Sequence, residues 1–357
     1  MKPQKHANIP IFIPHLGCPN NCVFCNQRSI SGHLDFDAET VRDEIENALA
    51  TIGERDAEIA FFGGSFTGID RSLMLYLLGV AKEYVELGKV SGIRLSTRPD
   101  YIDREILDIL RSHGVTAVEL GLQSMCDHVL SFAKRGHDSA CAERACALVK
   151  EYGFELVGQM MIGLPESTLP DEIYTANKLC EMGVDAVRVY PTVVFCDTEL
   201  ALMCEKGSYT PISNEEAVMR VKEVLKIFDR QGVRCLRVGL CASENLSSDK
   251  AVIGGANHSA IGELAMGEVF FDRLCEELDR RADQLLPGAK IDIFVPRGAT
   301  SKAVGQQKKN LLRLQQKYFQ KNGIKAVKIH EIDTLLGYNI KIKIEGNGGD
   351  PSVLKIT

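Results

Sequence analysis

Three cysteines near the start of the chain constrain it more than any other feature. Cys18, Cys22 and Cys25 have C-x3-C-x2-C spacing after an apolar run at residues 9–14, and Phe24 precedes the third cysteine. Thiolates are the soft ligands that hold iron in iron-sulfur clusters, and three in one loop can bind three irons of a [4Fe-4S] cube. The fourth iron would then stay open, so the spacing predicts a cluster that can bind a small molecule.

Two other interpretations of these cysteines stay open at this point. Structural zinc usually has four ligands in two separated pairs, but no second C-x2-C and no H-x3-5-H pattern follows. Three unrelated cysteines are the other alternative, because the chain has 12 cysteines in all. We interpret the remaining ones mostly as small buried hydrophobic residues. An oxygen-labile cluster and so many thiols indicate a reducing compartment, so a cytoplasmic protein is expected.

The apolar pattern of the body predicts alternating strands and helices. Strand-like runs lie at residues 9–14, 57–62, 92–96, 116–121, 155–162 and 185–190. Amphipathic stretches separate them, such as the one that Asp37 can cap, where Val41, Ile45 and Leu49 recur on one helical face. Six strand-helix units in a row imply a parallel sheet curled into part of a barrel, with functional residues at the carboxyl ends of the strands.

Glycine-rich and polar motifs follow these strands in order. They are residues 63–68 (GGSFTG), 96–100 (STRPD), 119–124 (ELGLQS), 134–137 (KRGH), 160–165 (MMIGLP) and 189–191 (VYP). Glycines let a ligand approach the backbone closely, and the serine, glutamine and arginine side chains offer hydrogen bonds. Each motif alone is typical of an ordinary turn or strand end. Together they indicate a binding site along one edge of the sheet.

The cysteine loop with its aromatic residue resembles the signature loop of the radical S-adenosylmethionine (radical SAM) enzymes. Across residues 9–240, the ordered motifs look most like the radical domain of the Elongator catalytic subunit and its short bacterial relatives, and residues 254–264 resemble the region after the barrel in those relatives. Oxygen-independent coproporphyrinogen oxidases are the next closest. The resemblance implies an α/β fold with a partial (βα)6 TIM-like barrel, a [4Fe-4S] cluster and S-adenosylmethionine.

The resemblance also implies roles for individual residues. Cys18, Cys22 and Cys25 would hold the cluster. The implied cofactor-binding residues are Phe24, Gly63, Gly64, Ser65, Ser96, Gln123, Arg135, Gln159, Ile162, Gly163 and Tyr190. Relatives usually have a glutamate where Ser96 stands, so this contact departs from the family pattern. No residue is assigned a catalytic role from the sequence.

Charge divides the chain unevenly between its body and its C-terminal part. Residues 290–345 contain twelve Lys or Arg and four Asp or Glu, a net charge of +8, whereas residues 1–289 carry −14. We expect a radical SAM barrel at residues 1–240, a helical extension at 241–289, a small basic domain at 290–345 and a tail at 346–357. The chain after residue 290 is too short for the acetyltransferase domain of the Elongator subunit, so that activity is not expected.

The basic domain resembles a KH-type RNA-binding unit. Residues 291–296 and 324–331 are predicted strands, and residues 300–304 and 310–320 are predicted helices around a Gly305-Gln306-Gln307-Lys308 loop. KH units clamp the nucleic-acid backbone with a G-x-x-G loop, and here Lys308 replaces the second glycine. The candidate phosphate-binding residues are Lys302, Lys308, Lys309 and Arg313. A small dimerisation or capping domain with a solvated lysine face is the open alternative.

The leading hypothesis is a radical SAM enzyme that generates a 5′-deoxyadenosyl radical and modifies a tRNA nucleoside. Its expected partners are tRNA or another RNA, and a flavodoxin or ferredoxin as electron donor. A coproporphyrinogen oxidase-like or other small-molecule radical enzyme is one alternative. An RNA-binding iron-sulfur redox sensor is another, of a different class. No run of eighteen apolar residues and no signal peptide is evident, so neither a membrane span nor a membrane partner is expected.

Overall fold

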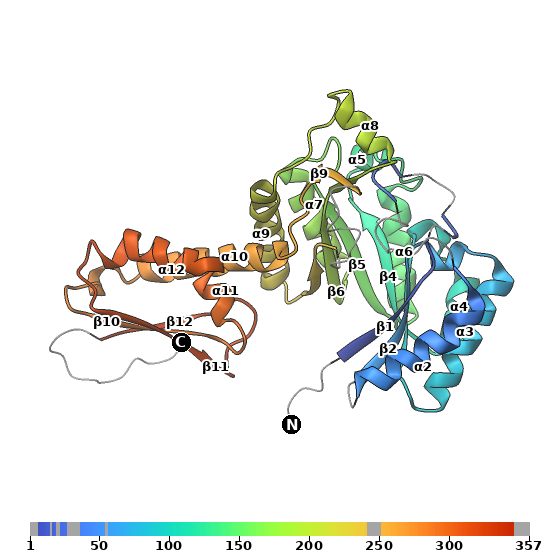
Figure 1. Ribbon diagram of the computed structural model, residues 1–357, viewed down its shortest axis with the longest axis horizontal. Coiled ribbons are helices and arrows are strands. Elements are labelled where there is room, and N and C mark those ends of the chain that lie inside the picture. The colour runs from blue at the N-terminus through green and yellow to red at the C-terminus, as the bar shows by residue number, and fades with distance from the viewer. Residues whose placement is uncertain are drawn as a thin grey trace.

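A parallel sheet of seven strands forms the body of the protein, with the strand order β1-β2-β3-β4-β5-β6-β8 (Figure 1). The computed structural model describes residues 6–14, 16–18, 22–26, 36–53, 56–240 and 251–345. The strands are β1 (His6–Phe12), β2 (Asp56–Phe62), β3 (Gly92–Thr97), β4 (Val115–Gln123), β5 (Glu155–Ile162), β6 (Ala186–Pro191) and β8 (Arg234–Val238). This curled parallel sheet confirms the predicted α/β partial barrel.

The seventh strand, β8, is an addition that the apolar pattern did not predict. It pairs in parallel with β6 at the edge of the sheet, and Val238 is the register partner of Val189. Its sequence, RCLRV, places arginines at every third position, and Leu236 is exposed. A half-exposed edge strand needs little apolar surface, which explains why the apolar pattern shows no clear strand signal here.

Most of the helices that follow these strands begin at polar caps. They are α2 (Val41–Ile52), α3 (Arg71–Glu86), α4 (Arg104–Ser112), α5 (Asp127–Phe132), α6 (Ser139–Glu151), α7 (Leu169–Glu181), α8 (Glu199–Glu205) and α9 (Asn214–Arg230). Asp37 caps the short 3-10 turn Ala38–Thr40 that leads into α2, as predicted. Asp70 and Asp103 accept hydrogen bonds from the first backbone N–H groups of α3 and α4, which leaves fewer of them unsatisfied.

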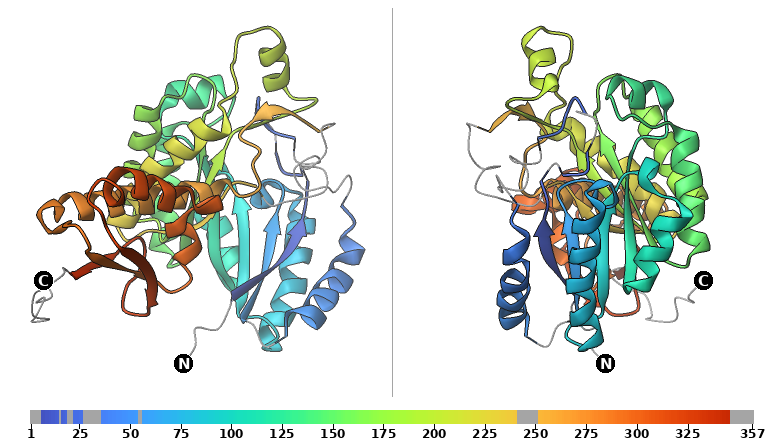
Figure 2. Two further views of the ribbon diagram at one scale, coloured as in Figure 1. Left: turned by 60° about the vertical axis from the view of Figure 1, so that its left-hand side comes forward. Right: turned by 90° about the vertical axis from the view of Figure 1, so that its right-hand side faces the viewer.

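Alternating residues of the strands separate the sheet into an apolar and a polar face. Side chains such as Ile9, Ile59, Leu95 and Leu120 are fully buried in the main core with the helices. Two short strands, β7 (Val193–Phe195) and β9 (Val252–Gly255), pair antiparallel and lie with α8 beyond the carboxyl ends of the sheet strands (Figure 2). The described residues of the cysteine loop lie at the same end, where Val23 is hydrogen-bonded to Leu200 of α8.

A small domain follows the long helix α10 (Ile261–Asp279). It contains β10 (Lys290–Pro296), α11 (Thr300–Val304), α12 (Lys309–Leu314), a π-helical turn at Gln315–Phe319, β11 (Ala326–Ile332) and β12 (Lys341–Glu345). The central strand β10 pairs in parallel with β11 and antiparallel with β12. The predicted strand-helix-helix-strand order is therefore present, and β12 is a third strand that was not predicted.

One helix, α10, contributes to both hydrophobic cores of the protein. Ile261 and Val269 belong to the barrel core, whereas Phe270, Leu274 and Leu278 belong to the core of the small domain. Figure 1 shows α10 running from the barrel into the small domain, where α11 and α12 lie beside it. A continuous helix buried at both ends fixes the small domain relative to the barrel. No helix in the described part of the chain is long and apolar enough to cross a membrane.

Candidate active site

The cysteine loop lies directly against the turn that follows β2. Gly17 has a φ of +74°, and a Cβ atom at this position would lie 2.2 Å from the carbonyl oxygen of Ser65. On the facing side, a Cβ atom on Gly68 would lie 2.5 Å from the carbonyl oxygen of Gly17. Only glycine permits both the positive φ and this backbone contact. The turn formed by the GGSFTG motif thus supports the start of the cysteine loop.

The second half of the cysteine loop is held from the opposite side by two backbone hydrogen bonds. The N–H of Val23 donates to the carbonyl of Ala133 at 3.3 Å, and the N–H of Leu200 donates to the carbonyl of Val23 at 2.8 Å. Val23, Ala133 and Leu200 are buried together in a small apolar cluster, against which Phe24 packs. The aromatic residue of the motif therefore has a structural contact, and its contact with a cofactor stays a prediction.

Buried arginines lie beside the cysteine sulfurs. Nη1 of Arg135 donates to Sγ of Cys22 at 3.1 Å, and its Nη2 donates to the carbonyl of Gly121 at 2.7 Å. Burial raises the pKa of the Cys18 thiol, whereas a backbone hydrogen bond at Ser65 and the charges of Arg98 and Arg135 lower it. These cations oppose the burial cost of negative charge on sulfur.

The donor set of this loop fits an iron-sulfur cluster. As the side chains stand, no three His, Cys, Asp or Glu residues of the described ranges converge into a metal site. Cys18, Cys22 and Cys25 nevertheless lie on one loop, and Nε of Arg135 is buried with no hydrogen-bond partner among the described residues. A cationic N–H donor without a partner, next to three thiolate ligands, suits a negatively charged cluster of iron and sulfide that the thiolates bind.

The hydroxyl of Ser65 forms hydrogen bonds within the protein. Ser65 is buried, and its Oγ lies 2.9 Å from Oγ1 of Thr97, which is 2.6 Å from Oγ1 of Thr67. The backbone N–H of Arg98 also donates to Oγ of Ser65 at 3.3 Å. This chain of hydroxyls joins the turn after β2 to the end of β3. Among the predicted cofactor residues of this turn, Gly63 has a φ of +96° beside Ile13, and Gly64 is half-buried.

The polar face of the sheet carries a buried network centred on Glu119 of β4. Its carboxylate accepts hydrogen bonds from Nε and Nη2 of Arg188 at 2.8 and 3.0 Å. It also accepts one from Nε2 of Gln159 at 2.8 Å, and the same amide donates to Oγ of Ser96 at 3.2 Å. Two of the predicted cofactor residues, Ser96 and Gln159, are therefore neighbours on the inner face of the barrel. Glu119 and Arg188 were not predicted as site residues.

A second arginine extends this network toward the amino ends of the strands. Arg94 is buried and donates to Glu58 at 2.9 Å, to Glu155 at 2.7 Å and to Glu119 at 3.4 Å. Nη2 of Arg234 donates to the other oxygen of Glu155 at 2.7 Å. Buried charges persist only when they are paired. A charged residue inside an apolar strand, at the spacing of the polar face, is the sequence signal that could have revealed these residues.

Aromatic side chains line the same face closer to the cysteine loop. The rings of Phe12 and Phe62 have centroids 6.5 Å apart, and the guanidinium of Arg188 lies 5.6 Å from the Phe62 centroid. Tyr190 is the register partner of Met161, and both are half-buried. The predicted Tyr190 thus belongs to a partly open apolar zone between the buried charges and the cysteines. Such a zone suits a ligand with an aromatic base.

Gln123 occupies a strained position at the end of β4. Its φ is +66°, and its Oε1 is buried without a hydrogen-bond partner among the described residues. A non-glycine residue in the left-handed region and an unsatisfied acceptor both cost free energy. Because strained residues cluster at ligand-binding sites, the observation supports Gln123 as a ligand-binding residue that accepts a hydrogen bond.

The predicted adenine-binding turn after β5 is tightly held. The N–H of Gly163 donates to Oε1 of Glu172 at 2.7 Å, and its carbonyl accepts the Tyr209 hydroxyl at 2.6 Å. The carbonyl of Ile162 accepts the N–H of Thr192 at 2.8 Å. Burial raises the pKa of Glu172 to about 7. The backbone groups of this turn are thus occupied by protein partners, and contact of Ile162 and Gly163 with a cofactor stays a prediction.

In the 305–308 loop of the small domain, the last two residues adopt the left-handed backbone conformation that is most common for glycine. Gln307 and Lys308 have φ values of +52° and +63°. Lys308 and Lys309 are exposed, and Lys302 is half-buried. Within the described ranges, neither Lys302 nor Lys308 has an acidic partner.

Arg313, the fourth predicted RNA-binding residue, is already paired. Its Nη1 donates to both oxygens of Glu268 at 2.8 and 2.9 Å, and its guanidinium lies 3.5 Å from the ring centroid of Phe271. Lys309 lies 3.7 Å from the same carboxylate. Arg313 therefore joins α12 to α10 and is less available to an RNA phosphate than Lys302 or Lys308.

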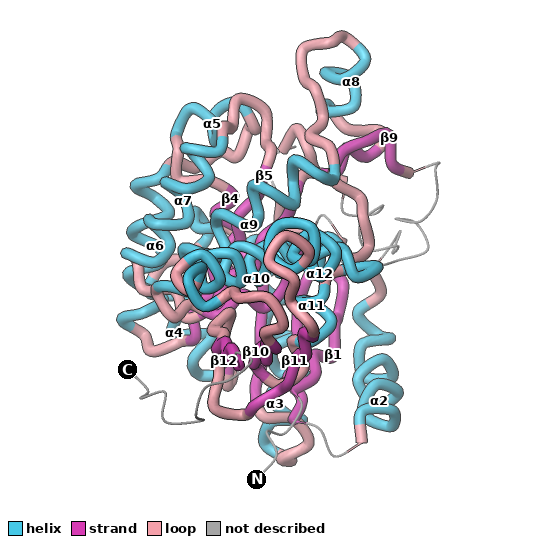
Figure 3. Tube along the Cα trace, turned by 90° about the vertical axis from the view of Figure 1, so that its left-hand side faces the viewer, coloured by secondary structure: helices cyan, strands magenta, loops and turns pink. Residues whose placement is uncertain are grey.

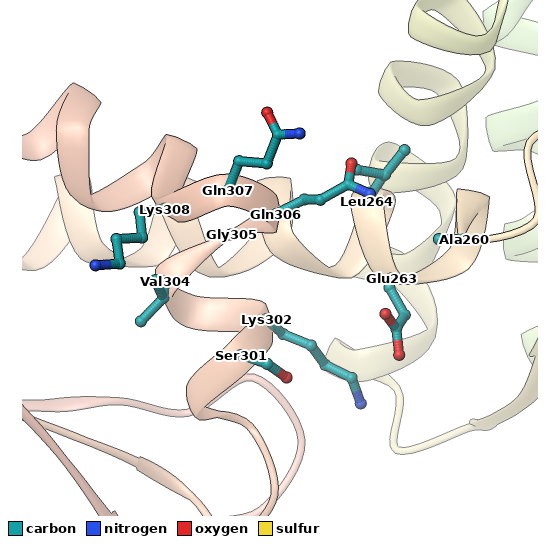
Figure 4. A pocket seen from close by; sticks show the side chains of 10 residues that line it. All are labelled: Ala260, Glu263, Leu264, Ser301, Lys302, Val304, Gly305, Gln306, Gln307 and Lys308. Carbon is teal, nitrogen blue, oxygen red and sulfur yellow. The ribbon is translucent and has the colours of Figure 1, made fainter.

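Two adjoining cavities flank the 305–308 loop. One of about 370 Å³ lies between α10 and the loop, and Figure 4 shows Lys302, Gln306 and Glu263 among its lining side chains. The other, of about 610 Å³, extends from the loop to the start of α9 at Asn214. Both cavities are lined by Glu263 and Gln306, so they form one groove between the barrel and the small domain.

Two protein-family models together match most of the chain. The model of the radical SAM superfamily matches residues 12–179, and that of the radical SAM C-terminal domain matches residues 184–269. The match includes the cysteine loop and every motif at the strand ends. Members of this superfamily are enzymes that use a [4Fe-4S] cluster and S-adenosylmethionine, which confirms the expected cofactors and enzyme class.

Several proteins resemble this chain over the same region. The uncharacterized protein MJ0486 of Methanocaldococcus jannaschii is 28% identical over 62% of this chain and 72% of its own length. The tRNA uridine(34) acetyltransferase of the same organism is 30% identical over 48% of this chain and 31% of its own length. Human Elongator complex protein 3 is 31% identical over 60% of this chain and 47% of its own length.

One solved structure shows the same fold. The archaeal Methanocaldococcus infernus Elp3, with an N-terminal deletion, has a TM-score of 0.59 and 22% identity, covering 78% of this chain and 64% of that one. The chain spans less than half of the tRNA acetyltransferase and of the human Elongator protein. What those whole proteins do does not follow from the shared region.

Proposed function

This chain belongs to the radical SAM superfamily, and from that premise we propose that it modifies a tRNA nucleoside. The observation that carries the proposal is the similarity of its radical SAM region to two proteins named for tRNA uridine 34 and for Elongator. The basic small domain supports it, because a positively charged surface attracts nucleic acid. Acetyl transfer is not part of the proposal, since the chain covers 31% of the acetyltransferase.

The cysteine loop would hold the cluster through Cys18, Cys22 and Cys25. When bound, the cluster and S-adenosylmethionine supply a 5′-deoxyadenosyl radical that abstracts hydrogen from a substrate. Arg135 would donate hydrogen bonds to the sulfurs and offset their negative charge, as its contact with Cys22 indicates. Gly17 would keep the loop seated on the turn after β2.

The inner face of the barrel would orient the cofactor and the reacting nucleoside. The unsatisfied Oε1 of Gln123 would accept a hydrogen bond from a ribose hydroxyl, which removes its burial cost. Ser96 and Gln159 would offer polar contacts in front of the Glu119 network. Tyr190 and the neighbouring aromatic side chains would exclude water from the radical, which prevents side reactions.

RNA would reach this face from the small domain. Lys302 and Lys308 border the groove between the domain and the barrel, where phosphates would pair with them. We place the domain boundaries near residues 240, 290 and 345, in accordance with the sequence expectation. A flavodoxin or ferredoxin in the cytoplasm would supply the electron.

The experiment is anaerobic reconstitution with iron and sulfide, followed by an assay for 5′-deoxyadenosine in the presence of dithionite. The proposal expects a product that forms with the wild-type protein, increases with bulk tRNA and is lost in Cys22→Ala. Formation without any response to tRNA would point to a small-molecule substrate, as in the coproporphyrinogen oxidase-like alternative. No formation by a cluster-loaded protein would favour the redox-sensor alternative.

A further inference from the structure

The three-stranded sheet of the small domain has one face covered by helices and one face turned away from them. Ile291, Ile293 and Val295 of β10 are buried against α10, α11 and α12. The intervening residues Asp292 and Phe294 must project from the opposite face, because side chains alternate along a strand. Figures 1 and 3 show this second face directed outward, away from the helices. We call it the open sheet face.

An ordered aromatic pair lies on the open sheet face. Phe294 of β10 and His330 of β11 are register partners, and their rings stack with centroids 5.2 Å apart and an interplanar angle of 26°. Nε2 of His330 lies 2.7 Å from Oδ1 of Asp292, so the imidazole is fixed by a hydrogen bond as well as by stacking. β11 is an edge strand, and the His330 side chain is 42% exposed. A fixed ring is therefore accessible at the edge of the sheet.

Lysines flank this aromatic pair on the same face. Lys328 precedes His330 by two residues on β11, and Lys341 of β12 is the register partner of Phe294. Both lysines are exposed, and neither has an acidic partner within the described ranges. Lys343 is paired with Glu345 at 2.6 Å and contributes less. The open sheet face thus combines a stacking ring with two available cations.

We propose that the open sheet face binds single-stranded RNA, with one base stacked on the His330 and Phe294 pair and phosphates at Lys328 and Lys341. Stacking on aromatic rings together with cations along the backbone is the way in which proteins bind single strands without reading their sequence. The inference rests on the proposed function and deepens it, because it names a second RNA contact. A second copy of the chain fits less well, since two such faces would bring the same lysines against each other.

The open sheet face and the 305–308 loop can be tested separately. The loop connects α11 to α12, which lie on the covered side of the sheet, so the two surfaces are on opposite sides of the small domain. The spatial separation means that a substitution on one surface leaves the other intact. An RNA that contacts both would wrap around the domain edge formed by β11.

The chain has no tryptophan, so His330→Trp introduces a single tryptophan into the stacking position, where its emission can be excited apart from that of the tyrosines. We would titrate the full-length protein with an unstructured oligouridylate of about ten nucleotides. A stacked base should quench the fluorescence with saturation. The control is Leu87→Trp at the C-terminal end of α3, an exposed position on the barrel, whose fluorescence should not change.

Alanine variants of the protein without the added tryptophan distinguish the contribution of stacking from that of charge. Their affinity for the same oligouridylate is measured. His330→Ala should weaken binding by about 5- to 150-fold, the range measured for loss of one stacked base, with an unchanged salt dependence. Replacing Lys328 and Lys341 by alanine should reduce the slope of log affinity against log salt by about 1.4, since each phosphate contact on a single strand contributes about 0.7.

Two results would overturn the proposal. The first is an unquenched His330→Trp protein together with a His330→Ala protein that binds the oligouridylate as tightly as the wild type. The second is a change of oligomeric state in His330→Ala, measured by sedimentation, without a change in RNA affinity, because the face would then contact protein. The deoxyadenosine response to tRNA is measured in a separate assay. The proposed function can therefore be confirmed while this inference fails, and this inference can be confirmed while the proposed function fails.

Discussion

Glu119→Gln is the substitution that most directly probes the buried charges of the barrel. Glu119 is fully buried and accepts hydrogen bonds from both Arg188 and Gln159, with Arg94 at 3.4 Å. Glutamine keeps the shape and one acceptor oxygen but removes the negative charge. The two buried guanidinium groups then lose part of the negative charge that balances them. Breaking a buried pair in this way costs about 3–5 kcal/mol of unfolding free energy.

The matched control lies in the same network. Glu155 pairs with Arg94 and Arg234, but its side chain is 26% exposed, so water can replace the lost charge. Glu155→Gln should cost about 1 kcal/mol or less, in the range of solvent-accessible pairs. Urea unfolding of the reduced apo-proteins, followed by far-UV circular dichroism, gives both free energies if the m-values agree. Equal losses in the two variants would refute a buried network centred on Glu119.

Three further predictions concern the cysteine loop, the turn after β5 and the small domain. Gly17→Ala should lower the iron and sulfide bound per chain after reconstitution, because its Cβ would collide with the Ser65 carbonyl; full iron content would contradict the docking of the loop. Burial raises the pKa of Glu172 to about 7, above its unfolded value, so the folded state binds the extra proton and wild-type stability should fall as the pH rises through about 5 to 7. Glu172→Gln should abolish this slope in urea midpoints, and parallel pH curves would disprove the assignment. Lys308→Ala should weaken tRNA binding and reduce its salt dependence, whereas Arg313→Ala should mainly lower stability; equal effects on tRNA affinity would show that the Arg313 ion pair opens for RNA.

The parts of the fold that the sequence predicted are those with strong local signals. The helix from Asp37 has both a cap and a regular apolar face, and Val41 and Ile45 are buried as expected. Four strands were missed: β7, β8, β9 and β12. In β8 the arginines are three positions apart and the leucine is exposed, whereas β12 alternates lysine and isoleucine over only five residues. Pairing with a neighbour decides such edge strands, and that information is not local.

The candidate site shows the same division between local and non-local information. The cysteine spacing predicted the cluster ligands directly, and the motif order predicted the edge of the sheet at which they lie. The roles of Arg135 and Glu119 depend on which strands become neighbours. Arg135 donates to Cys22, which precedes it by 113 residues. Glu119 accepts hydrogen bonds from residues of β3, β5 and β6. Contacts of this kind follow from the curled sheet and have no signature within a single segment.

The transfer of a hydrogen atom from tRNA tests the central claim most directly. The reconstituted protein would be incubated with S-adenosylmethionine, reductant and tRNA from cells grown in deuterated medium, and the 5′-deoxyadenosine would be analysed by mass spectrometry. The account predicts that the product carries deuterium in the wild-type reaction and that no product forms with Cys22→Ala. Deoxyadenosine that forms in the presence of deuterated tRNA but contains no deuterium would contradict it.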